Sequence, residues 1–122
     1  YALLEDQTVF DNLALVFRHR IQKRDTEEMK QALEAVDLSK SYLKKHIYEL
    51  SSGEQQRVAI ARLILKKPRI ILIDEPTAAL DHDTATDILY QVLDRLINDQ
   101  TIMIVATHDP LVIQWGDVMI DV

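Results

Sequence analysis

The chain has 122 residues, of which 48% are hydrophobic, and it contains no cysteine. This length suits one domain or a large part of one, and the hydrophobic fraction is sufficient for a buried core. The 14 basic and 20 acidic residues give a net charge of -6, which argues against a nucleic-acid partner, because nucleic-acid binding needs a basic face. The lack of cysteine excludes disulfides and thiolate metal sites, and no apolar run approaches the roughly 20 residues of a membrane span.

The first half of the chain has the apolar spacing of amphipathic helices. The first helix is expected to cover residues 8–20, and Pro68 is expected to end the last one, because proline cannot continue a helix. The expected helix starts are Thr8, Asp25 or Thr26, and Ser51 or Ser52, all of them residue types that cap helices.

The second half alternates between apolar runs and helical patterns. The expected strands span residues 70–73, 101–106 and 118–122. One expected helix begins at Asp83 or Thr84, and a second, short one covers residues 110–115. Unbroken apolar strands joined by helices are typical of a parallel sheet covered on both faces. We therefore predict an α/β fold in which a small parallel sheet is flanked by helices.

Ionisable side chains follow the ends of two expected strands. Asp74 and Glu75 close the first strand, and His108 follows the second. Parallel sheets bind ligands outside the carboxyl ends of their strands, so these side chains are expected at one rim. Asp74 could hold a water of Mg²⁺, Glu75 could orient or deprotonate an attacking water, and His108 could contact a phosphate oxygen. The alternative is structural, because such residues also cap helices and donate ordinary hydrogen bonds.

A second candidate lies at the start of the helix that follows residue 50. The sequence there is Leu50-Ser51-Ser52-Gly53-Glu54. Free N–H groups and the helix dipole make a helix start suitable for an anion, and Gly53 allows the backbone to approach a phosphate closely. The alternative is an ordinary serine cap followed by a polar helix.

Four segments together resemble the ABC family of ATPases. In chain order, these are the signature motif at residues 50–57, the Walker B strand with its catalytic glutamate at 70–76, the D-loop Ala79-Leu80-Asp81 and the switch histidine His108. The resemblance covers essentially the whole chain, and four motifs in order are far more specific than one. It implies a partial P-loop NTPase-like fold, with a helical signature subdomain at residues 1–67 and the C-terminal part of a RecA-like core at 68–122.

The resemblance also implies a role for each matching residue. Ser51, Ser52, Gly53 and Glu54 would contact the ATP of a partner subunit, and Asp81 would communicate across the dimer interface. Asp74 would support Mg²⁺ through water, Glu75 would activate the attacking water, and His108 would sense the γ-phosphate.

The chain departs from the family's pattern in two ways. Ser52 replaces a glycine and Glu54 replaces a glutamine of the usual LSGGQ motif, and no GxxxxGK[ST] phosphate loop occurs. The sequence begins at Tyr1 without a Met. We therefore expect a fragment that is inactive alone and that self-associates through exposed sheet edges.

The function implied by the resemblance is ATP hydrolysis coupled to membrane export, of the peptide, lipoprotein or bacteriocin type. The implied partners are a second nucleotide-binding domain, in a homodimer or heterodimer, and a transmembrane permease. The implied location is cytoplasmic, at the inner face of the cell membrane. One alternative is a soluble ABC-type ATPase that acts on ribosomes or DNA, and another is a non-catalytic interaction module.

Overall fold

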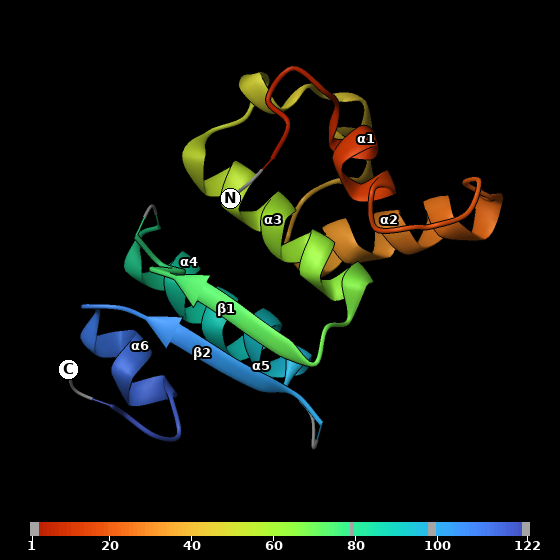
Figure 1. The fold of residues 1–122 in the computed structure, drawn as a ribbon. Coiled ribbons are helices and arrows are strands. Elements are labelled where there is room, and N and C mark those ends of the chain that lie inside the picture. Colours follow the sequence, from red (N-terminus) through yellow and green to blue (C-terminus); the bar gives the residue numbers. More distant parts are fainter. Residues whose placement is uncertain (1–2, 79, 98–99, 121–122) are drawn as a thin grey trace. The chain divides into compact units, whose positions relative to one another are not determined.

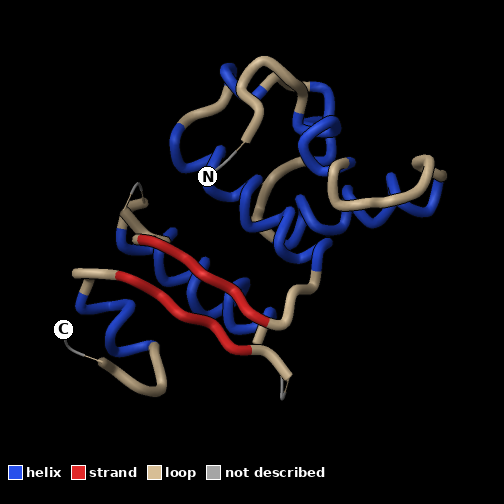
Figure 2. Tube along the Cα trace, in the orientation of Figure 1, coloured by secondary structure: helices blue, strands red, loops and turns tan. Residues whose placement is uncertain are grey.

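The computed structural model describes residues 3–78, 80–97 and 100–120, apart from the side chains of Val92 and Arg95. The chain divides into two compact units, Tyr1–Lys67 and Pro68–Val122. The first is helical and the second contains the strands (Figures 1 and 2). None of the helices in the described ranges is long and apolar enough to cross a membrane.

The first unit is organised around α3, which both α1 and α2 contact. Its elements are α1 (Val9–Ala14), α2 (Lys23–Ala35), the 3-10 helices η1 (Lys40–Lys44) and η2 (Ile47–Glu49), and α3 (Ser52–Lys66). All five helices contribute to its core, η1 and η2 with one buried side chain each. The largest fully buried apolar side chains are Val9, Leu13, Met29, Leu33, Val36, Ile47 and Val58. Lys67 ends α3 in the left-handed conformation, directly before Pro68 as the sequence predicts.

Two helix boundaries in this unit differ from the prediction. α1 ends at Ala14 rather than at residue 20, because the next N–H groups, those of Val16 and Phe17, bond three residues back, as in the tightened last turn of a helix. α2 starts at Lys23, so Asp25 lies inside its first turn. The Asp25 carboxylate still serves the helix start, since it accepts the N–H of Gln22 at 2.8 Å.

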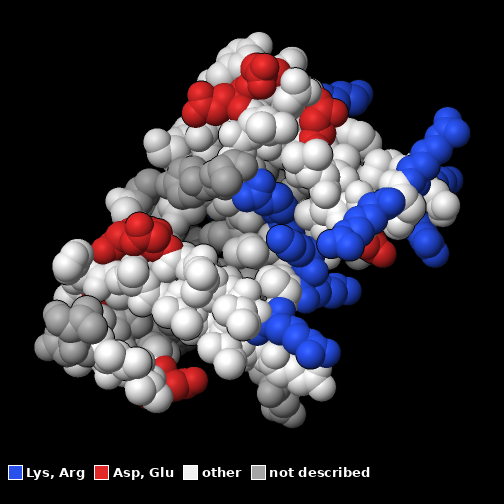
Figure 3. Space-filling model, viewed as in Figure 1, with Lys and Arg blue, Asp and Glu red and all other residues white. Residues whose placement is uncertain are grey.

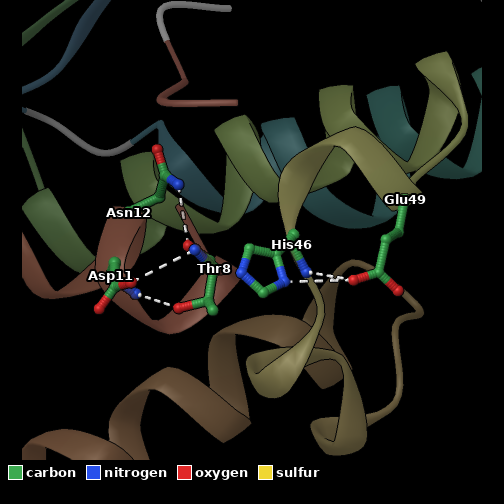
Figure 4. A network of polar contacts seen from close by, with 5 residues as sticks. All are labelled: Thr8, Asp11, Asn12, His46 and Glu49. Atoms are coloured by element: carbon green, nitrogen blue, oxygen red, sulfur yellow. Dashed lines mark hydrogen bonds and ion pairs between the residues drawn. The ribbon is translucent and has the colours of Figure 1, made fainter. Parts of the chain in front are cut away.

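The N-terminal segment is tied to the segment that leads into α3 (Figure 4). Thr8 caps α1 by accepting the Asp11 N–H at 3.1 Å, and it forms an isolated antiparallel bridge with His46. The N–H of His46 donates in turn to Glu49 Oε1 at 3.1 Å. Because residue 46 lies five positions before Ser51, these bonds fix the approach of the chain to the start of α3.

The second unit is a β-α-β arrangement. The strands β1 (Ile70–Asp74) and β2 (Ile102–Ala106) are parallel, with Ile70 opposite Ile102 and Asp74 opposite Ala106. The connection runs through α4 (His82–Asp87), the π-helical η3 (Ile88–Leu93) and α5 (Asp94–Leu96), and α6 (Pro110–Trp115) follows β2. Figure 1 shows the α4–η3–α5 stretch behind the two strands. The positions of β1, β2 and α6 agree with the prediction to within one residue at each end.

The sheet of the second unit is covered on one face only. Ile71 of β1 and Leu89 of η3 are buried, but the alternate residues of both strands are exposed. The exposed large apolar residues of the strands are Ile70, Leu72, Ile102 and Ile104. The prediction of two covered faces is therefore wrong for the described residues, because apolar strand composition does not itself supply the covering element.

The predicted third strand is also absent from the described part of residues 118–122. Val118, Met119 and Ile120 belong to no strand and are exposed, while the last two residues of that prediction lie outside the described ranges. A strand needs a neighbour for its backbone hydrogen bonds, and the apolar sequence alone does not provide one.

Candidate active site

The start of α3 is fixed by a reciprocal pair of hydrogen bonds. The hydroxyl of Ser51 accepts the N–H of Glu54 at 3.1 Å, and Glu54 Oε1 accepts the N–H of Ser51 at 3.0 Å. This capping box satisfies two N–H groups that the helix itself leaves unpaired. Ser51 is therefore the N-cap of α3, and Ser52 is its first helical residue.

The capping box is extended by a tyrosine that the sequence interpretation missed. The Tyr42 hydroxyl donates to Glu54 Oε2 at 2.6 Å, and the Lys45 ammonium lies 4.2 Å from the centre of the Tyr42 ring. The Tyr42 hydrogen bond, followed by that of the Ser51 N–H, lowers the pKa of the Glu54 carboxyl. Glu54 is thus held ionised, with both oxygens bonded within its own unit.

Ser52, which replaces a glycine of the usual signature motif, fits the helix start without strain. Among the described residues, φ is positive only at Asp37, Lys67 and Glu75. Ser52 and Gly53 therefore both have backbone conformations that residues with a side chain adopt readily. Ser51 and Ser52 are exposed and Gly53 is half-buried, so the first turn of α3 is accessible from solvent.

In the second unit, the structure brings Glu75 and His108 together at the rim of the sheet. Asp74 is the last residue of β1 and is exposed. Glu75 follows it, and its carboxylate Oε1 accepts the backbone N–H of His108 at 3.0 Å. The exposed His108 lies two residues beyond the end of β2. These positions agree with the expectation that all three residues share one rim.

The backbone at Glu75 is unusual for a residue with a side chain. Its φ is 46°, in the left-handed region, and its N–H continues the sheet by donating to the Ala106 carbonyl at 2.7 Å. Such conformations cost on the order of 1–3 kcal/mol and persist where the surroundings hold them in place. This turn directs the carboxylate of Glu75 toward the residues that follow β2.

Three further polar residues at this rim were given no role from the sequence. The Thr107 hydroxyl donates to Glu75 Oε2 at 3.1 Å, and the buried Thr77 donates to Asp109 Oδ2 at 2.6 Å. The Asp109-Pro110 pair was the available signal, because an Asp before a Pro is typical of a helix start. Asp109 does cap α6, but its bond to Thr77 joins residues 32 positions apart and has no local signature.

Asp81 lies at the start of α4, away from the two strand ends in the chain. Its Oδ1 accepts the N–H of Thr84 at 2.8 Å, so it is the N-cap of α4, two residues before the predicted start at Asp83 or Thr84. Ala79, which belongs to the same predicted D-loop, lies outside the described residues. Capping is thus a structural function of Asp81, and its role at a dimer interface stays a prediction.

The rim offers limited support for a metal ion. The described residues include no group of three or more His, Asp or Glu that could hold a metal. Mg²⁺, however, is commonly held by one or two carboxylates together with water and substrate phosphates. The exposed carboxylate of Asp74 at a strand end fits that kind of site.

Comparison with known proteins identifies the class of protein to which these features belong. The sequence profile of the ABC transporter family matches residues 1–78, and the chain belongs to this family. The predicted family and the predicted fold class, an α/β partial P-loop NTPase-like fold, are both confirmed.

The similar proteins include one relative from Mycoplasma pneumoniae and several solved cassettes. The MG468.1 homologue of that organism, named as an ABC transporter ATP-binding protein, is 37% identical over 93% of this chain. The chain spans 39% of that relative's length. It also matches dimeric MJ0796, a bacterial ABC transporter cassette, with a TM-score of 0.81 and 31% identity, covering 94% of this chain and 52% of the cassette.

Two further structures add a nucleotide state and an assembly to this comparison. MJ0796 in a post-hydrolysis state, bound to ADP and Pi, matches with a TM-score of 0.80 at 31% identity, over 94% of this chain and 52% of that one. CbiO1 of Clostridium perfringens, part of the ABC transporter complex cbiONQ, matches with a TM-score of 0.69 at 25% identity, over 88% of this chain and 43% of that one.

Proposed function

We propose that this chain forms part of the ATP-hydrolysing subunit of an ABC transporter. The observation that carries the proposal is the hydrogen bond between Glu75 Oε1 and the His108 N–H, 3.0 Å long. It joins a candidate base to the backbone of the residue that carries the candidate phosphate-contacting imidazole, at one rim of a parallel sheet in a chain of the ABC family. Residues 1–67 then form the signature subdomain, and residues 68–122 form part of the RecA-like core.

The reaction is transfer of the γ-phosphoryl group of ATP to water, giving ADP and phosphate. Glu75 orients the attacking water and accepts its proton, and the imidazole of His108 contacts the γ-phosphate. Asp74 would hold Mg²⁺ through water, and that ion would supply positive charge to neutralise the phosphates. Most of the rate enhancement comes from such positioning and charge stabilisation.

The signature residues serve the ATP held by a second nucleotide-binding domain. Ser51, Ser52 and Gly53 present the first turn of α3 to the γ-phosphate, where N–H groups and the helix dipole favour an anion. The negative charge of Glu54 is directed to Tyr42 and to the Ser51 N–H. This arrangement reduces the conflict between Glu54 and the phosphate, and Asp81 acts at the same interface between domains.

The coupled partners are a second nucleotide-binding domain, identical or different, and a transmembrane permease. The support lies in similar proteins, since MJ0796 was solved as a dimer and CbiO1 belongs to a transporter complex. Acidic and basic side chains are both visible in Figure 3. The proposed docking partner is a permease at the cytoplasmic side of the membrane. Export stays a prediction from the family resemblance.

The test is Glu75→Gln in the natural full-length protein. Removal of the base is expected to lower kcat for ATP by about 10²–10⁴-fold and to leave ATP binding intact, because the amide keeps the shape of the side chain. Turnover is measured by phosphate release and binding by calorimetry. Glu34→Gln, in an exposed position of α2, is the matched control. Wild-type turnover in Glu75→Gln would remove the role given to Glu75.

A further inference from the structure

The residues around Glu75 and His108 form a continuous chain of hydrogen bonds within the second unit. Glu75 Oε1 accepts the N–H of His108, and Glu75 Oε2 accepts the hydroxyl of Thr107 at 3.1 Å. Both carboxylate oxygens are therefore bonded to the segment that follows β2. The position of Glu75 relative to His108 depends on how that segment is itself fixed.

The hydroxyl of Thr107 has a defined direction. It accepts the N–H of Asp109 at 2.9 Å, and a threonine hydroxyl has a single proton to donate. That proton is left for Glu75 Oε2. The backbone N–H of Asp109 thus orients the Thr107 hydroxyl, which donates to the carboxylate of Glu75.

Asp109 is held in turn from the other side of the rim. The hydroxyl of Thr77 donates to its Oδ2 at 2.6 Å, and the N–H of Leu111 donates to its Oδ1 at 2.9 Å. Hydrogen bonds to an ionised carboxylate are shorter and stronger than neutral ones. These two bonds, the one from Thr77 first, lower the pKa of the Asp109 carboxyl.

Thr77 belongs to the same turn as Glu75. It lies two residues after Glu75, it is only 4% exposed, and its carbonyl accepts the N–H of Leu80 at 3.1 Å. The Thr77–Asp109 bond is therefore a second connection between the strand ends, parallel to the Glu75–His108 bond. Two such connections restrict the relative movement of the turn after β1 and the segment after β2.

We propose that Thr77 and Asp109 are positioning residues that set the distance between the Glu75 carboxylate and the segment carrying His108. This inference rests on the proposed ATPase function. Neither residue needs to touch ATP, since Thr77 acts through Asp109, and Asp109 acts through Thr107. Losing the connection widens the range of positions open to Glu75, so the chemical step slows while the affinity for ATP is kept.

The experiment compares four variants in the natural full-length protein, and Glu75→Gln is measured beside them as a fifth. Thr77→Val removes the hydroxyl and nearly keeps the side-chain volume, whereas Thr77→Ser keeps the hydroxyl. Asp109→Asn keeps a good helix cap but loses the charge that strengthens the Thr77 bond. Thr86→Val is the matched control, because the Thr86 hydroxyl donates to the His82 carbonyl within α4.

Thr77→Val is expected to lower kcat for ATP by about tenfold to a hundredfold, with KM changed by less than about twofold. Asp109→Asn is expected to lower kcat in the same way, while Thr77→Ser and Thr86→Val keep values close to wild type. Unchanged kcat in Thr77→Val, or equal losses in Thr77→Val and Thr77→Ser, would overturn the inference. If Thr77→Val does not fold, wild-type kcat in Asp109→Asn overturns it.

The same series separates this inference from the proposed function. If the wild-type protein does not hydrolyse ATP, or if Glu75→Gln turns over as fast as wild type, the proposed function fails. If Glu75→Gln is inactive and Thr77→Val retains wild-type kcat and KM, the proposed function stands and only the positioning role is lost.

Discussion

Glu54 is a charged residue at a position expected to face a phosphate, and its hydrogen bonds explain how that charge is accommodated. Its two oxygens are bonded to the Ser51 N–H and the Tyr42 hydroxyl. Hydrogen bonds that involve a charged group contribute on the order of 1.5–3 kcal/mol each. Glu54 therefore stabilises the signature segment itself, in addition to any contact it makes with nucleotide.

Tyr42→Phe tests this contribution, because it removes only the hydroxyl. The free energy of unfolding of the first unit is expected to fall by about 1–2 kcal/mol at pH 7. Tyr48→Phe is the control, since Tyr48 is 66% exposed. Chemical denaturation followed by helical circular dichroism measures both variants. An equal effect in the two would show that the Tyr42–Glu54 bond adds no stability.

The effect of Tyr42→Phe should also depend on pH. The folded-state pKa of Glu54 is lowered from its ordinary value of 4.5, so ionised Glu54 contributes stability that is present above that value and is lost as the pH falls through the folded pKa. The difference between wild type and Tyr42→Phe is therefore expected to shrink below about pH 4.5. A difference that is constant down to pH 3 would contradict the assignment to ionised Glu54.

Individual residues at the rim were predictable where the signal was local. Asp74, Glu75 and His108 stand at strand ends that the apolar runs delimit, so their neighbourhood could be predicted from the sequence. The bond between Thr77 and Asp109 spans 32 positions and that between Tyr42 and Glu54 spans 12. Such pairs depend on how the elements pack, and no periodicity in the sequence encodes them.

At the level of elements, the two adjacent serines at the start of α3 have different structural functions. Ser51 accepts the N–H of Glu54 through its hydroxyl, whereas Ser52 lies in the first helical position and is exposed. Ser51→Ala is expected to destabilise the helical unit by about 1 kcal/mol, the usual effect of a lost N-cap. Ser52→Ala is expected to change it by less than about 0.5 kcal/mol, as for most surface positions.

Thermal unfolding of the two serine variants, compared with wild type, measures this difference. The pair is well matched because the substitution is the same and the positions are adjacent. Equal destabilisation by Ser51→Ala and Ser52→Ala would mean that the capping box does not hold the start of α3.

Elements with strong local determinants agree with their prediction, and those that depend on partners do not. α6 covers Pro110–Trp115 as expected, because an Asp cap and a first-turn proline define its start. α1 ends early, because the N–H groups of Val16 and Phe17 bond three residues back, which the apolar spacing does not reveal. The third strand fails for a related reason, because residues 118–120 have no paired neighbour in the described structure.

At the level of the whole molecule, the exposed face of the sheet has consequences for the chain expressed on its own. Ile70, Leu72, Ile102 and Ile104 form two cross-strand pairs, Ile70 with Ile102 and Leu72 with Ile104, and each is more than half exposed. Contiguous apolar surfaces of this kind promote association. The 122-residue chain by itself is therefore expected to self-associate.

Light scattering over a range of concentrations tests this expectation. Ile104→Lys, which places a charge within the exposed ladder, is expected to shift the chain toward the monomer. Ile113→Lys adds the same charge on α6 of the same unit and is the control. A monomeric wild-type chain at every concentration would contradict the prediction.

We also expect the 122 residues alone not to hydrolyse ATP, because they contain no GxxxxGK[ST].

The central claim is that Glu75 and Gly53 of one chain serve two different ATP sites in a dimer. Gly53→Asp adds a negative charge in the first turn of α3, where the helical backbone accepts a side chain. If the claim holds, a mixed dimer of a Glu75→Gln protomer with a Gly53→Asp protomer has both defects in one site and an intact second site. A mixed dimer of the double variant with wild type then has one defect in each site.

The decisive measurement is therefore ATP turnover by these two mixed dimers, purified with different affinity tags on the two protomers. Both dimers contain the same two substitutions and differ only in their distribution. The account predicts measurable turnover when the substitutions are on separate protomers and much lower turnover when they share one protomer. The reverse order would show that Glu75 and Gly53 act at the same ATP and would contradict the account.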